Sequence, residues 1–148
     1  MPIGVAADAD TRAYAMTLTK RRLHQPVFRM QVMLAYGSRC AICRLAHPEL
    51  LDAAHIIEDG KPKGTPVVPN GLSLCKIHHA AFDAKILGVR PDLTLHVRHD
   101  VLEEVDGWML KGGIQGVHNK QLEVVPGSSA MRPDPERLEV RYSEFLAS

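Results

Sequence analysis

The sequence predicts a small α+β domain organised around a structural zinc ion, with helices at both ends. Two short metal-binding motifs, Cys40-Ala-Ile-Cys43 and Cys75-Lys-Ile-His78, are separated by 31 residues. Between and after them, apolar and turn residues follow the order strand, loop, strand, helix. The chain of 148 residues has the length of one domain and can bury a modest core.

The N-terminal region is predicted to contain two helices. Asp10 and Thr11 are candidate caps for a first helix that runs toward a basic cluster at residues 20–22. A firmer helix is expected to begin at Pro26, since proline is favoured at the first helical position. Gly37 is its expected C-terminal stop.

The firmer helix is expected to carry one apolar face. Val27, Met30 and Leu34 recur at helical spacing along it. The first metal-binding motif follows this helix at once.

The central region is predicted to form two strands joined by a loop. Residues 50–57 form a short apolar run that contains His55. Residues 58–69 hold two glycines and three prolines, which favour a loop. Asn70-Gly71 is a turn signal, and residues 72–74 are the expected second strand.

The second metal-binding motif is predicted to open a helix over residues 76–87 that Gly88 closes. Cys75 and His78 share one face of this helix and can therefore bind one ion. His79 is rotated by about 100° from its neighbour. Asp83, four residues on, returns to the face of His79, so the two could hold a second metal ion.

Near the C-terminus, Asp134-Pro135 is expected to open a last helix. Leu138, Tyr142 and Phe145 fall on one face of it and are expected to pack. Trp108 is the only tryptophan, and we expect it to anchor the core rather than to stack on a base.

The cysteines favour a structural zinc site. All three belong to the two motifs, and closed zinc sites take four thiolate or imidazole ligands. We therefore assign the ligands as Cys40, Cys43, Cys75 and His78. The alternatives are ordinary buried thiols and a thioredoxin-like redox motif, which usually lies near a βαβ pattern that is not found here.

Composition favours a cytoplasmic protein without a membrane span. Three cysteines, an odd number, argue against a secreted disulfide framework. No apolar run approaches about 18 residues, and residues 1–10 lack the features of a signal peptide.

Charge is unevenly distributed along the chain. Residues 1–90 carry a net charge of +5, and residues 91–148 carry −4. A basic half that contains the metal motifs suits a polyanion such as DNA, although ordinary solvated surface is the alternative.

Three segments of the sequence resemble the HNH endonucleases, or ββα-metal nucleases: residues 52–56, 69–75 and 78–83. The chain looks most like the zinc-hook subgroup found as the nuclease module of modification-dependent restriction enzymes. The likeness continues in residues 88–92, 102–107 and 113–118, and covers roughly residues 26–146. It implies a single nuclease domain with an N-terminal helical arm (1–25), a ββα-metal core (26–96) and a C-terminal extension (97–148).

The resemblance implies a role for each matched residue. His55 would be the general base that takes a proton from the attacking water. Asn70 would orient the loop and the histidine, and His79 would bind a catalytic divalent ion. Asp83 lies where many members place another ligand, which suits Mg²⁺ or Mn²⁺. Members often carry a metal ligand immediately before the base, whereas here that residue is Ala54.

The predicted activity is metal-dependent hydrolysis of DNA phosphodiester bonds, in restriction or defence. Lys76, Lys85 and Arg90 flank the metal helix and are candidate phosphate contacts. A separate DNA-recognition protein or domain, or a homodimer, is the expected partner. The alternatives are a zinc-containing DNA-binding module without catalysis, which would need only the two motifs, and a homing or phage-packaging nuclease.

Overall fold

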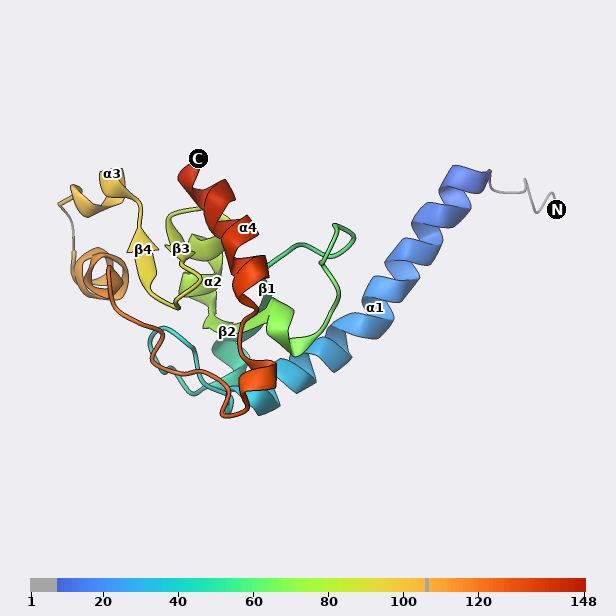
Figure 1. Cartoon of the computed structure of the whole chain (residues 1–148), viewed down its shortest axis with the longest axis horizontal. Helices are drawn as coiled ribbons and strands as arrows, with labels where there is room; N and C mark the ends of the chain where they lie inside the picture. The colour runs from blue at the N-terminus through green and yellow to red at the C-terminus, as the bar shows by residue number, and fades with distance from the viewer. Residues whose placement is uncertain (1–7, 106) are drawn as a thin grey trace.

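One long helix, α1 (Ala9–Ala35), leads into a body of short strands and helices (Figure 1). The computed structural model describes residues 8–105 and 107–148. Residues 1–7 lie outside the described residues. They include most of the segment in which no signal peptide was predicted and the start of the predicted N-terminal arm. The body contains β1 (Leu51–His55), β2 (Gly71–Cys75), α2 (Lys76–Asp83), β3 (Leu87–Val89), β4 (Leu95–Val97), α3 (His99–Leu102) and α4 (Pro135–Leu146).

The N-terminal region forms one helix rather than the two that were predicted. Asp8 is the N-cap, and its carboxylate accepts a hydrogen bond from the backbone N–H of Thr11 at 2.7 Å. Asp10 and Thr11 lie inside the helix instead of capping it. Pro26 also lies inside, where it removes one backbone hydrogen bond without ending the helix. The expected boundary between residues 25 and 26 consequently falls within α1.

The face of α1 that packs on the body differs from the predicted one. Phe28, Val32 and Tyr36 are almost fully buried. Val27, Met30 and Leu34, which were predicted to lie along one apolar face of the helix, are exposed. Figure 1 shows α1 extending away from the body as an arm. Both faces of this helix are apolar, so spacing alone did not identify the buried one.

β1 and β2 form an antiparallel pair in which Leu51 faces Cys75 and His55 faces Gly71. Gly71 begins β2 directly after a 3₁₀ turn at Val68–Asn70. A Cβ atom at Gly71 would lie 2.7 Å from Val32 Cγ2 and 2.9 Å from Phe28 Cζ. The absence of a side chain at Gly71 therefore allows α1 to approach β2 closely, at the position opposite His55.

The metal helix is shorter than predicted. α2 ends at Asp83, and Lys85 adopts a left-handed conformation with φ of 58°. Gly88 lies in β3, which pairs with β4 as a second antiparallel hairpin. A Cβ at Gly88 would meet the ring of Phe145 at 2.8 Å, so α4 packs closely on this hairpin.

The C-terminal helix follows the prediction. Asp134 caps α4 and accepts a hydrogen bond from the N–H of Glu136. Leu138 and Phe145 are buried, and Tyr142 is half-buried. Trp108, by contrast, is 80% exposed and does not anchor the core.

The mixture of helices with two small antiparallel sheets confirms the α+β class. Within the described part of the chain, no helix has both the length and the apolar character that crossing a membrane requires.

Candidate metal centre and nuclease site

The two Cys/His motifs meet at the N-terminus of α2. Cys40 and Cys43 lie in the turn that follows α1, Cys75 is the N-cap of α2, and His78 lies in its first turn. The four ligand atoms all lie within 4.8 Å of one another. Among the described residues, no other set of three or more His, Cys, Asp or Glu side chains converges in this way.

The distances within this cluster fit a tetrahedral zinc ion. His78 Nδ1 lies 3.2 Å from Cys75 Sγ and 3.8 Å from Cys40 Sγ, and Cys43 Sγ lies 4.0 Å from Cys75 Sγ. Zinc–sulfur bonds of about 2.3 Å and zinc–nitrogen bonds of about 2.0 Å place tetrahedral ligands roughly 3.5–3.8 Å apart. The cluster is therefore compatible with a closed, structural zinc site.

The ring of His78 is oriented for metal binding. Its Nε2 lies 2.7 Å from the carbonyl oxygen of Gly113, which can only accept a hydrogen bond. Nε2 therefore carries a hydrogen, and Nδ1 faces the sulfurs. Burial alone would lower the pKa of His78, but contacts with Cys40 and Cys75 raise it to about 10, so metal binding there displaces a proton.

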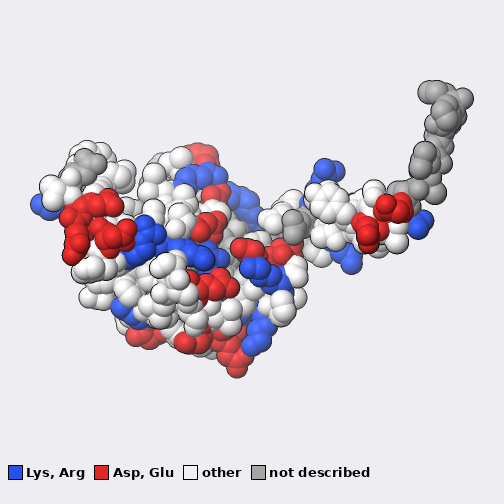
Figure 2. All heavy atoms as spheres, turned by 90° about the horizontal axis from the view of Figure 1, so that it is seen from above, with Lys and Arg blue, Asp and Glu red and all other residues white. Residues whose placement is uncertain are grey.

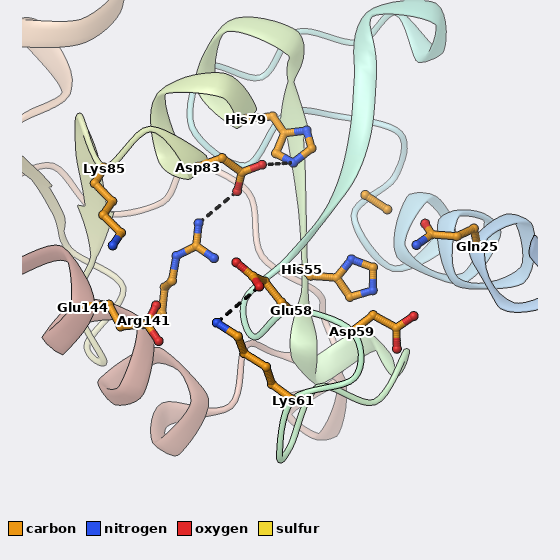
Figure 3. A pocket seen from close by; sticks show the side chains of 11 residues that line it. Gln25, His55, Glu58, Asp59, Lys61, His79, Asp83, Lys85, Arg141 and Glu144 are labelled. Carbon is orange, nitrogen blue, oxygen red and sulfur yellow. Dashed lines mark hydrogen bonds and ion pairs between the residues drawn. The ribbon is translucent and has the colours of Figure 1, made fainter. Parts of the chain in front are cut away.

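On the other side of α2 lies an open cavity of about 610 Å³. His55 from β1, His79 and Asp83 from α2, Gln25 from α1 and Arg141 from α4 contribute to its wall (Figure 3). Elements far apart in the sequence thus surround one site. Adjacent histidines face different sites, since His78 turns toward the sulfur cluster and His79 toward the cavity.

His55 lies at the end of β1 with its ring stacked on Phe28, with centroids 4.4 Å apart and planes inclined by 25°. The side chain is about half-buried, and this burial is the main reason that its pKa lies below the usual 6.5. The carboxylates of Asp59 and Asp83 oppose the shift, and His79 adds to it. Near neutral pH the ring is therefore uncharged and able to accept a proton.

Asn70 is fully buried and holds the loop between β1 and β2 closed. Its side-chain oxygen accepts from the N–H of Ile57 at 2.9 Å. Its amide nitrogen donates to the carbonyls of Ile57 at 3.0 Å and of Thr65 at 3.1 Å. These bonds fix the backbone immediately after His55.

His79 lies between two carboxylates. Its Nδ1 is 2.8 Å from Asp52 Oδ2, and its Nε2 is 3.1 Å from Asp83 Oδ2. A neutral imidazole has only one N–H, so the second contact needs another proton or a cation. Ligands of an octahedral Mg²⁺ at about 2.1 Å lie about 3 Å apart, which matches the separation of Nε2 and Oδ2. These two atoms fit a divalent ion.

Asp52 serves the opposite edge of the His79 ring. Burial alone would raise its pKa, but hydrogen bonds from His79 and Lys76 hold the pKa below its usual value. A carboxylate that accepts from Nδ1–H leaves Nε2 free to bind a metal, a common arrangement around metal-bound histidines. Ala54 is fully buried and offers no ligand, so water and phosphate oxygens would complete the shell.

Sequence reasoning missed Arg141, because α4 was interpreted only as a packing helix. Its guanidinium donates to Asp83 Oδ1 at 2.9 Å and to the carbonyls of Ile56 and Phe82 at 3.2 Å. It also lies 4.1 Å above the ring of Phe82. No local motif in the sequence could connect Arg141 to a partner 58 residues away.

The three candidate phosphate contacts occupy different surroundings. Lys85 lines the cavity beside Asp83. Lys76 pairs with Asp52. Arg90 donates to the carbonyl of Leu95 in the β3–β4 hairpin, and it does not line the cavity. On the face seen in Figure 2, basic and acidic side chains are interspersed rather than gathered into one basic surface.

One segment of the chain matches a known protein family. Residues 40–90 match the family model of the HNH endonucleases. The fold resembles that of a solved structure described as a modification-dependent TagI restriction endonuclease, with a TM-score of 0.55 and 22% identity. The match covers 79% of this chain and 36% of the other, so this chain spans about a third of that protein. No curated protein matches the sequence. The resemblance to HNH endonucleases and the expected fold are confirmed.

Proposed function

Because residues 40–90 carry the HNH endonuclease motif, we propose that this protein is a metal-dependent endonuclease that hydrolyses DNA phosphodiester bonds. One observation carries the proposal. His55 and the His79–Asp83 pair line a single open cavity, and Asn70 holds the adjoining loop closed. This arrangement offers a neutral base and a pair of metal ligands to one phosphate group.

In the proposed reaction, His55 takes a proton from a water molecule whose oxygen forms a bond to phosphorus. The bond from phosphorus to the 3′ oxygen breaks, and the departing oxygen takes up a proton from solvent. The products are a 5′ phosphate and a 3′ hydroxyl. A positioned base of this kind contributes roughly 10² to 10⁴ in rate.

His79 Nε2 and Asp83 would hold Mg²⁺ or Mn²⁺, which would offset negative charge on the phosphate and the departing oxygen. Asp52 fixes the ring of His79 from the other side. Lys85 lines the cavity, and in this proposal it would contact a neighbouring phosphate. Phosphate contacts by Lys76 and Arg90 remain predictions. We assign the Cys40, Cys43, Cys75 and His78 cluster to structural Zn²⁺.

The proposal is tested by plasmid cleavage with His55→Ala. The change should abolish nicking in Mg²⁺, Mn²⁺, Co²⁺ and Ni²⁺, while zinc content and DNA binding stay close to wild type. His99→Ala is a matched control, because His99 is exposed and lies outside the cavity. Retained cleavage by His55→Ala, or equal loss in the control, would contradict the assignment of the base.

Modified and unmodified plasmids should be compared in the same assay. The solved structure that this fold resembles is described as a modification-dependent restriction enzyme, and this similarity supports a role in restriction or defence. We propose that a separate recognition protein or domain supplies specificity, that two protomers act together on duplex DNA, and that the protein works in the cytoplasm.

A non-catalytic zinc-containing DNA-binding module is the alternative from another class. Such a module needs the sulfur cluster but not His55, Asn70, His79 and Asp83 around one cavity. DNA binding without cleavage in any of the four metals would favour it. A homing or phage-packaging nuclease would share the chemistry and differ in its target.

A further inference from the structure

The exposed face of α1 carries a heptad pattern of side chains that the body of the molecule leaves largely exposed. Met16, Lys20, Leu23, Val27, Met30 and Leu34 alternate at spacings of four and three residues. This is the a/d pattern of a coiled-coil seam. The five apolar members are between 49% and 75% exposed. Two copies of such a seam can pack against each other.

The seam points away from the nuclease site. Phe28 and Val32 pack on the body from the opposite face of α1, and Phe28 stacks on His55. Gln25, on the same side as Phe28, lines the catalytic cavity. A second helix along the seam would therefore leave the cavity open.

The first two thirds of α1 bury little surface against the body. Between residues 8 and 27, none of the side chains that the structure describes is buried. Isolated helices of fewer than about 12–15 residues are marginal in water, and longer ones gain most of their stability from packing an apolar face. The part of α1 that extends from the body in Figure 1 therefore buries little of the apolar surface that normally stabilises a helix of this length.

The size of the seam fits an interface between two copies. Its five apolar side chains expose on the order of 600 Å², the upper limit for an apolar patch on a typical monomer. Complete burial of these side chains in two copies would remove up to about 1,200 Å² of surface from water, which is the lower end of the range for specific interfaces. The flanking positions Thr17, Thr19, His24 and Gln31 carry no Asp, Glu, Lys or Arg side chain that would repel a second copy.

We propose that this face of α1 is the interface of a homodimer in which two α1 helices pack antiparallel. A parallel pair would place Lys20 against the partner's Lys20. An antiparallel pair centred on Gln25 instead places Lys20 against the partner's Met30, so the aliphatic part of the lysine side chain can lie along apolar surface. The same pair places Leu23 against the partner's Val27.

The same alignment places Met16 beside the partner's Leu34. Leu34 borders an apolar groove of about 560 Å³ that is also lined by Val67, Pro69 and Met131. The N-terminal half of each helix would thus be covered by the seam and groove of the other copy. The interface is isologous and closes at two subunits. It does not rest on the proposed nuclease activity.

Light scattering and sedimentation of the zinc-loaded chain, without DNA or Mg²⁺, test the interface. The wild-type chain should have twice the mass of the 16.3 kDa monomer. Leu23→Glu combined with Met30→Glu should weaken the dimer by at least about 100-fold, with zinc content unchanged. Tyr14→Glu is the matched control, because Tyr14 is 66% exposed on the opposite face of the same helix. A monomeric wild type, a dimeric double variant or a monomeric control would overturn the interface.

Disulfide trapping tests the orientation. A mixture of Leu23→Cys and Val27→Cys proteins, kept zinc-loaded so that the native cysteines are protected, should form a mixed disulfide under mild oxidation. Each variant alone, and the wild type, should cross-link far less. Efficient cross-linking of Leu23→Cys with itself would indicate parallel helices and overturn the antiparallel arrangement.

Discussion

His55 owes its proposed role to its immediate surroundings. The ring lies at the end of a strand, is stacked on Phe28 and faces the cavity. Burial keeps the imidazole uncharged, while Asn70 fixes the next two residues through the amide and carbonyl of Ile57. A neutral base in a fixed position is what attack by water on a phosphate diester requires.

The pH dependence of cleavage should report the state of His55. A protonated ring cannot accept a proton, so kcat/KM should fall as pH decreases through the lowered pKa. The midpoint of the acidic limb should lie below the usual 6.5 of histidine, with a plateau above it. Single-turnover nicking at pH values from about 5 to 8 measures this limb.

A second variant separates His55 from other titrating groups. Phe28→Leu removes the stacked ring and admits water, so it should move the midpoint upward toward the value of free histidine. A midpoint above 6.5 in the wild type, or a profile that does not respond to Phe28→Leu, would contradict the account of His55.

Arg141 should act as a positioning residue for Asp83. Its three hydrogen bonds join the end of β1, the end of α2 and the Asp83 carboxylate. Arg141→Lys keeps the charge but loses the planar set of donors. The free energy of unfolding should fall by about 1–3 kcal/mol, because buried carbonyls lose partners.

The dependence of cleavage on the concentration of the divalent ion distinguishes positioning of Asp83 from a purely structural role of Arg141, which would not change it. In Arg141→Lys, the Mn²⁺ concentration for half-maximal cleavage should rise, because Asp83 is no longer held beside His79. Arg137→Lys on the same helix is the control, since Arg137 binds Asp134 and the carbonyl of Lys63 outside the cavity. Unchanged Mn²⁺ dependence in Arg141→Lys would contradict the positioning role.

At the level of elements, the sequence indicated the strand, loop, strand, helix order because each piece has its own local signal. The prediction of buried residues failed where one helix has apolar residues on two faces. α1 has apolar residues on both faces, and contact with Gly71 at the start of β2 decides that Phe28, Val32 and Tyr36 are the buried ones. The spacing of Val27, Met30 and Leu34 was real but belongs to the surface that we propose for a second copy.

Gly88 shows a second reason why the sequence did not predict the structure. A glycine after an apolar helical pattern predicts a helix end, yet α2 ends five residues earlier and Gly88 lies in a three-residue strand. Its small size matters because the ring of Phe145 packs over it. Contacts between residues so distant in the sequence leave no local pattern, and the same reason hid Arg141.

For the molecule as a whole, the match to the HNH endonuclease model covers residues 40–90, while the site that we propose draws on helices outside this segment. α1 supplies Phe28 behind His55, and α4 supplies Arg141 behind Asp83. The matched segment therefore contains the candidate chemistry but not all of the groups that hold it in place.

Zinc binding by the Cys40, Cys43, Cys75 and His78 cluster should determine whether this body folds. Cys40 and Cys43 tie the turn after α1 to the start of α2, and His78 extends the connection through Gly113 to the segment Met109–Ile114. Structural zinc contributes apparent binding free energies of about 10–16 kcal/mol in small domains, more than many such domains have in total stability. We therefore expect one zinc ion per chain by elemental analysis, and loss of the cooperative melting transition when a strong chelator removes it.

Cys43→Ser should lower the melting temperature and weaken zinc retention, whereas His99→Ala, which changes an exposed side chain outside the cluster, should change neither. Metal-free wild-type protein that melts at the same temperature as the zinc-loaded form would show that the cluster is not structural, because a closed site that holds three segments together cannot be emptied without loss of stability.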